Sequence, residues 1–180
     1  HTAEQTLTEL TRRDEQELIY FDSVLESISR SRTKAEIAEI REELTAGGYL
    51  KAPATKPKKT QVPVLREYKS AEGYRIIVGK NNRQNDYITT TLAAKNDLWF
   101  HTKNIPGSHV VVMCGGKEVS DETLIYAATL AAENSGAAAG AQVPVDYTPV
   151  KFVKKPNGAK PGMVIYTTNK TLYVTPNNRG

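Results

Sequence analysis

The segment from Asp97 to Val112 constrains the fold most strongly, because it joins two apolar runs through a polar, turn-forming insert. Proline presets φ to about −65° and glycine accepts positive φ, so Pro106-Gly107 within this insert favours a tight turn. The β-branched run after the turn is typical of a buried strand. The segment therefore predicts two neighbouring strands whose ends gather four polar side chains: Asp97, His101, Ser108 and His109.

These four side chains are compatible with several kinds of chemistry. A hydrolase would use Ser108 as nucleophile, a histidine as base and Asp97 as orienting carboxylate, but the serine does not stand in a Gly-x-Ser-x-Gly elbow. A metal site could add Cys114, although the histidine spacing matches no standard zinc pattern. The residues can also simply hydrogen-bond the turn, or contact RNA with Trp99 or a histidine stacked on a base. Trp99 is favoured as a core residue, and we expect no catalytic residue, metal or other cofactor.

Charge is distributed unevenly along the chain. Residues 1–50 carry 6 Lys or Arg and 11 Asp or Glu, whereas residues 51–180 carry 18 and 9, so a net charge of −5 is followed by one of +9. A basic domain favours a polyanionic partner such as nucleic acid, although a merely solvated surface has the same composition. We expect an acidic arm followed by a basic domain.

The first fifty residues have a helical pattern. Leu18, Phe21, Leu25 and Ile28 follow a 3-4-3 spacing that is typical of a coiled-coil seam in a helix over residues 3–30. Thr33 and Glu36 form a capping box for a second helix, which Gly47-Gly48 ends. The pattern predicts an antiparallel helical hairpin over residues 1–50.

A lysine- and proline-rich linker, residues 51–63, separates these helices from a domain over residues 64–180. The domain's predicted helices are a short one capped near Asn85 and an alanine-rich one from Ser120 or Asp121 to about Ser135. Hairpin turns are expected at Gly158 and Asn169-Lys170. Strands are expected at residues 74–78, 98–101, 109–113, 142–147, 150–153, 163–166 and 171–175. The fold class is α+β: a mostly antiparallel sheet with about two packed helices, preceded by the coiled-coil hairpin.

Two further motifs offer contacts to RNA. The box from Gly79 to Asn85 combines a flexible glycine, two cations and several amides, which can bind phosphate, ribose or base edges or can satisfy the box's own backbone. The lysines around the turn Pro156-Asn157-Gly158 form either a basic hairpin for a nucleic-acid backbone or a solubilising loop. The expected phosphate contacts are Lys80, Arg83, Lys154, Lys155 and Lys160.

Four motifs, in order and spacing, resemble the NFACT-R domain. They are Asp97-Leu-Trp-Phe-His with Pro106-Gly-Ser-His, the box Val78-Gly-Lys-Asn-Asn-Arg-Gln-Asn-Asp86, the alanine-rich run Ala127–Ala132, and the basic loop Val153–Gly162. The likeness extends from about Glu67 to Pro176. The chain begins with His1, so we expect a fragment of a longer family member that retains the end of the family's coiled coil.

The resemblance implies a binding function for this chain without catalysis. Family members are ribosome-associated quality-control factors that bind tRNA, alanyl-tRNA in particular, and ribosomal RNA on obstructed large subunits. The full-length protein promotes C-terminal alanine tailing of stalled chains. This implies a cytoplasmic, ribosome-associated protein that does not insert into membranes. The alternative is a bacterial surface adhesin that binds fibronectin, since some members are described in that way.

The candidate RNA-binding residues come from three of these four motifs, all except the alanine-rich run. They are Lys80, Asn81, Arg83, Gln84, Asn85, Asp97, Trp99, His101, Lys103, Ser108, His109, Lys154, Lys155 and Lys160.

Overall fold

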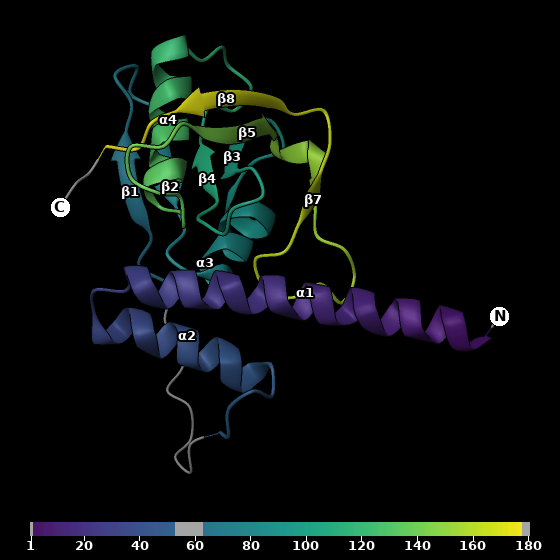
Figure 1. Ribbon diagram of the computed structural model, residues 1–180. Helices are drawn as coiled ribbons and strands as arrows, with labels where there is room; N and C mark the ends of the chain where they lie inside the picture. Colours follow the sequence, from purple (N-terminus) through teal and green to yellow (C-terminus); the bar gives the residue numbers. More distant parts are fainter. Residues whose placement is uncertain (1, 53–62, 178–180) are drawn as a thin grey trace.

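The computed structural model describes residues 2–52 and 63–177, and confirms the predicted α+β class. Two antiparallel helices, α1 (Thr2–Arg30) and α2 (Lys34–Ala46), lie across one end of a sheet domain (Figure 1). The predicted linker 51–63 falls almost entirely outside the described residues. We call α1 and α2 together the helical hairpin.

A six-stranded antiparallel sheet forms the centre of the domain, in the order β1-β2-β4-β3-β5-β8. Its middle strands β3 and β4 are the two apolar runs joined by the Pro-Gly turn, and they pair with Leu98 opposite Val112 and Phe100 opposite Val110. The other strands extend the sheet on both sides. The strands are β1 (Arg66–Lys69), β2 (Arg75–Val78), β3 (Leu98–Thr102), β4 (Val110–Val112), β5 (Val143–Pro149) and β8 (Lys170–Val174).

Helix α4 (Asp121–Glu133) covers one face of the sheet, and Ser120 caps it by accepting a hydrogen bond from the Thr123 amide. Its small alanine side chains allow the helix to lie close to the strands, and Ala127, Ala128 and Ala131 are fully buried. The other face carries Trp99, Ile77 and Val111 beneath α3 (Asn82–Tyr87) and a π-helical turn, Ile88–Leu92. The alternation of side chains in β3 thus places Trp99 in one core and Phe100 in the other.

The helical hairpin has its own small core of Tyr20, Val24 and Ile40. The predicted coiled-coil seam is wrong as the packing face: Leu18 is 66% exposed and Leu25 is 63% exposed. The face used instead is offset by one to two residues, because α1 must contact both α2 and the sheet domain. The predicted capping box holds in part, since Thr33 Oγ1 accepts from the Glu36 amide while the Glu36 carboxylate accepts from Arg32.

Three local predictions are corrected by the structure. Residues 150–153 are mainly a 3₁₀ turn (Val150–Phe152) that leads into β6 (Val153–Lys154), because backbone bonds to Asp97 and Lys95 hold this segment. Gly158 does lie between the paired strands β6 and β7 (Ile165–Tyr166), but Asn169-Lys170 is no hairpin turn, since β7 and β8 belong to different sheets. The cap of α3 is Asn81, whose side chain accepts from the Gln84 amide, and not Asn85.

None of the helices within residues 2–52 and 63–177 is long and apolar enough to cross a membrane.

Candidate nucleic-acid interface

The amides of the Gly79–Asn85 box hold the helical hairpin against the domain. Asn81 Nδ2 and Gln84 Nε2 both donate to one oxygen of Glu39, each at 2.7 Å, and both amide side chains are buried. The Gln84 carbonyl in turn accepts from the Lys80 amide at 3.1 Å. Two residues that the sequence nominated as RNA contacts are therefore already satisfied within the chain.

We expect Glu39→Ala to lower the free energy of unfolding by about 2–3 kcal/mol, because it leaves two buried amide donors without their charged acceptor. The matched control is Glu42→Ala, one turn further along the same helix. Its ion pair with Arg83 at 2.9 Å is open to water, with side chains 58% and 40% exposed, so we expect a loss below about 1 kcal/mol. Urea denaturation of the two variants measures both values, and equal losses would contradict the assignment.

Asn85 joins the box to the Pro-Gly turn. Its Oδ1 accepts from the His109 amide at 2.9 Å and its Nδ2 donates to the Gly107 carbonyl at 3.2 Å. Gly79 makes room for this side chain: a Cβ on residue 79 would lie 2.1 Å from Asn85 Oδ1. Glycine is therefore required at position 79 so that the backbone there can approach the Asn85 side chain closely, and Asn85 positions the turn.

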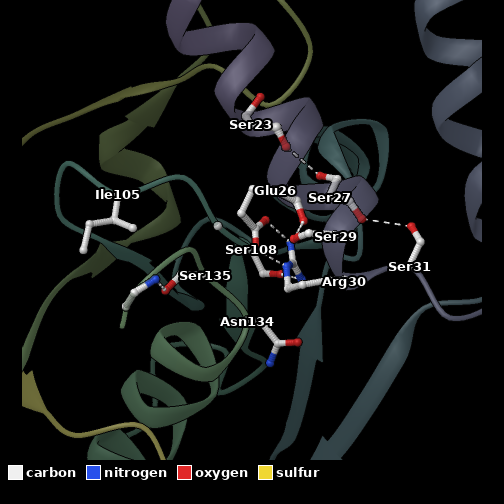
Figure 2. Close-up of polar contacts among 12 residues, drawn as sticks. Ser23, Glu26, Ser27, Ser29, Arg30, Ser31, Ile105, Ser108, Asn134 and Ser135 are labelled. Atoms are coloured by element: carbon white, nitrogen blue, oxygen red, sulfur yellow. Dashed lines mark hydrogen bonds and ion pairs between the residues drawn. The ribbon is translucent and has the colours of Figure 1, made fainter. Parts of the chain in front are cut away.

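Ser108 fastens the end of α1 to the same turn (Figure 2). Its hydroxyl donates to the Gly79 carbonyl and accepts from Arg30 Nη1 at 3.1 Å. Arg30 also forms a two-point ion pair with Glu26, one contact of which measures 2.7 Å. Ser108 is fully buried, and these contacts give it a positioning role.

Asp97 lies at the opposite end of β3 from His101. Its carboxylate accepts from the Ala94 and Gly115 amides, both at 2.8 Å, and so closes the turn before β3 onto the turn after β4. The hypothetical Ser-His-Asp arrangement is therefore not assembled, because Asp97 and Ser108 serve separate backbone sites. No group of three or more His, Cys, Asp or Glu side chains that could hold a metal occurs in the described part of the chain.

The two histidines and Trp99 form one aromatic cluster. Trp99 stacks on His101 with 5.7 Å between ring centroids, and it meets His109 edge-on at 5.1 Å. Thr89 Oγ1 lies 2.7 Å from His109 Nδ1. Burial lowers the pKa of His101 to about 4 and that of His109 well below its usual 6.5, with the neighbouring His101 adding to the shift. Both imidazoles are therefore neutral at pH 7. Trp99 is fully buried, as expected of a core residue.

The neutral histidines predict acid sensitivity. In the unfolded chain each imidazole takes up a proton below pH 6.5, whereas in the folded chain His101 does so only near pH 4, so stability is lost as the pH falls through this window. Burial raises the pKa of Glu26 and of Glu43, which opposes this loss.

We expect His101→Gln to reduce the stability lost between pH 7 and pH 4.5 by about 1–3 kcal/mol. Urea denaturation at several pH values measures this difference. Glu26 and Glu43 are present in both proteins, so their contributions cancel in the comparison. Parallel curves for the variant and the unchanged chain would contradict the assignment.

Most of the cations nominated from the sequence are engaged by carboxylates. Lys80 pairs with Glu36 at 3.3 Å, Arg83 with Glu42, Lys155 with Asp86 at 2.8 Å, and Lys160 with Glu17 at 3.2 Å. All but Asp86 of these acidic partners belong to the helical hairpin. The acidic arm therefore neutralises part of the basic domain within the chain. Among the residues that the structure describes, no ion pair is found for Lys154 or Lys103, and both are exposed.

Three exposed lysines lie at one end of the sheet, and of these the sequence singled out only Lys151, as one of the lysines around the turn Pro156-Asn157-Gly158. The Lys151 amide donates to the Lys95 carbonyl at 2.9 Å. Asp97, two residues after Lys95, accepts a hydrogen bond from the Gly115 amide. Lys117 follows this turn, two residues after Gly115. No carboxylate lies within ion-pair distance of Lys95, Lys117 or Lys151 in the described residues. We call these three the lysine rim; only the folded chain could reveal it, because they are far apart in sequence.

A nucleic-acid binding class is supported by comparison with known families. A family model described as the NFACT protein RNA binding domain matches residues 64–167, and one described as the NFACT N-terminal and middle domains matches residues 1–63. The chain belongs to the NFACT family, and its sheet domain is the family's RNA-binding domain.

Curated relatives agree with this assignment. The chain is 49% identical over 171 residues to the Rqc2 homolog RqcH of Bacillus subtilis, an alignment that covers 93% of this chain and 30% of the relative. It is 45% identical over 172 residues to the Rqc2 homolog RqcH of Streptococcus suis, which covers 94% of this chain and 30% of that protein. The chain thus spans about a third of the length of these relatives.

A solved structure has the same fold. It is the C-terminal part of the fibronectin/fibrinogen-binding protein from Streptococcus suis, and it superposes with a TM-score of 0.91 at 42% identity. The match covers 98% of this chain and 70% of that chain.

Proposed function

We propose that this chain is the RNA-contacting end of a bacterial ribosome quality-control factor. It binds tRNA and large-subunit ribosomal RNA on obstructed large subunits, in the cytoplasm. The complete protein recruits alanyl-tRNA and promotes C-terminal alanine tailing of stalled chains, for which this chain alone does not suffice. The family's RNA-binding domain and the kinship with Rqc2 homologs support this proposal. We retain residues 1–50, 51–63 and 64–180 as the proposed division into hairpin, linker and domain.

The proposed position of the RNA-facing surface rests on one observation, the lysine rim. Exposed lysines without carboxylate partners can give up their counterions to phosphate without first breaking an ion pair, whereas Lys80, Arg83, Lys155 and Lys160 cannot. Lys154, exposed in β6 three residues after Lys151, extends this surface. We therefore propose that the first phosphate contacts fall on the rim and Lys154.

The proposed function is tested by co-sedimentation of the 180-residue chain with purified bacterial large ribosomal subunits. We expect binding at low salt that is released by free large-subunit RNA but not by an acidic protein of similar charge. Release by both competitors alike would argue for unspecific charge attraction and against the proposed role.

Fibronectin binding is the second candidate, favoured by the description of the structurally similar Streptococcus suis protein. It would place the protein at the cell surface. In a competition assay, an adhesin would bind immobilised fibronectin in the presence of excess tRNA. We expect tRNA to abolish such binding, because the same basic surface would serve both.

A further inference from the structure

A cavity of about 390 Å³ lies between α1 and the sheet, on the side of the Trp99 cluster. Its walls come from segments far apart in sequence, and Figure 1 shows α1 running across this end of the domain. Ile19 and Ser23 of α1 face the loop before Ser108 and the loop before β7. Asn82, His101, His109 and Tyr166 also line it. Its volume is within the range of small-molecule pockets.

The cavity offers flat walls with polar edges. Trp99 is among the residues that line it, and the ring centroids of Tyr166 and His109 lie 4.9 Å and 5.1 Å from that of Trp99. Trp99 Nε1 is buried and has no hydrogen-bond partner among the residues that the structure describes, which is unusual for a buried indole. His109 Nδ1 is already engaged by Thr89 Oγ1, whereas the neutral imidazole of His101 provides one donor and one acceptor, the same kind of groups that a nucleobase presents on its edges.

A larger groove of about 860 Å³ adjoins the cavity, and both are lined by Met163 and Val164. Arg12 and Arg13 of α1 line this groove opposite the Pro156–Lys160 loop. Both arginines are exposed, and neither has a carboxylate within ion-pair distance among the described residues. Asp14 and Glu17 also line the groove, but Glu17 is engaged by Lys160 and Tyr49.

We propose that the cavity binds one unpaired nucleobase of the RNA and that the adjoining groove carries the phosphates next to it, held by Arg12 and Arg13. A cationic track beside an aromatic pocket is the arrangement by which proteins hold single-stranded nucleic acid. A duplex cannot present a base to a cavity beneath a helix without unpairing it. The site would distinguish single-stranded ends or loops from paired stems. The proposal rests on the proposed RNA binding but makes a separate claim.

Trp99 is the only tryptophan of the chain, so its fluorescence reports on this cavity alone. The experiment titrates the whole chain with a short oligoadenylate, the same length of abasic oligonucleotide, and a blunt RNA duplex. Fluorescence anisotropy of labelled RNA measures binding, and Trp99 emission measures occupancy of the cavity. We expect oligoadenylate to change Trp99 emission, and the abasic strand and duplex to bind without changing it.

Two variants assign the contacts. His101→Phe keeps a ring but removes the polar edge, and we expect it to weaken oligoadenylate binding about 5- to 10-fold while duplex binding changes less than about twofold. Arg12→Gln with Arg13→Gln, at exposed positions, should weaken the abasic and intact strands alike. RNA binding that leaves Trp99 emission unchanged for every ligand would overturn the cavity proposal and leave the RNA-binding function intact. Failure of all three RNAs to bind would overturn the proposed function itself.

Discussion

Asn85→Ala is expected to destabilise the chain by about 2–5 kcal/mol, since it leaves the His109 amide and the Gly107 carbonyl buried without partners. Asn85 is 3% exposed, so in the intact chain its side chain, and not bulk water, provides these two hydrogen bonds. For a protein of this size the melting temperature should fall by roughly 5–15 °C. Thermal and urea denaturation measure the effect.

Asn169→Ala is the matched control, because Asn169 is exposed in the segment before β8. It should change the stability by less than about 0.5 kcal/mol. If the two variants melted alike, the Asn85 side chain would not be the link between the box and the turn.

Changing the lysine rim to glutamine, with Lys95→Gln, Lys117→Gln and Lys151→Gln, is expected to weaken RNA binding on the order of 10- to 100-fold at about 0.1 M salt. Each lost phosphate contact removes about 0.7–0.9 from the slope of log affinity against log salt, so the slope should flatten by roughly two to three units. Different RNA sequences should lose affinity equally, since phosphate contacts do not read bases.

The control triple changes Lys34, Arg41 and Lys51 to glutamine. These cations are exposed in or just after α2, away from the rim, so the net charge falls by the same amount while the rim stays intact. We expect the slope of log affinity against log salt for this control variant to remain within about half a unit of the slope for the original chain. Equal slopes for the two triples would mean that net charge, and not the rim, determines binding.

The strands around the Pro-Gly turn were predictable because local chemistry determines them. The β-branched run and the turn residues specify β4 and its connection, and the structure pairs it with β3 as expected. The alanine-rich helix and its Ser120 cap follow from local sequence in the same way. β1 was missed, because Arg66-Glu67-Tyr68-Lys69 has little apolar content and owes its conformation to pairing with β2.

The fate of the charged residues could not be predicted from their positions. The excess of negative charge in residues 1–50 and of positive charge in the remainder is evident in the sequence. Which carboxylate meets which cation depends on how the helical hairpin docks, as when Glu36 meets Lys80 and Glu17 meets Lys160. The unpaired lysines of the rim become identifiable only after these pairs have been assigned.

The polar residues of the Pro-Gly segment show the same limit. Their proximity in sequence suggested one site, but β3 separates Asp97 from His101, and Ser108 and His109 engage different partners. Asp97 and Ser108 position the backbone, whereas His101 and His109 line a cavity together with Asn82 of the preceding motif. Helix α1 forms one wall of the cavity. The packing of α1 against the sheet domain joins segments far apart in sequence, so no local pattern predicts it.

The most direct measurement of the central claim is the salt dependence of RNA affinity for the unaltered chain. With tRNA as ligand, the affinity should fall linearly on a log–log plot with a slope of about −3 or steeper, as the rim and Lys154 together make four phosphate contacts. A slope near zero, or no binding at about 50 mM salt, would contradict the conclusion that this chain binds RNA through its exposed lysines.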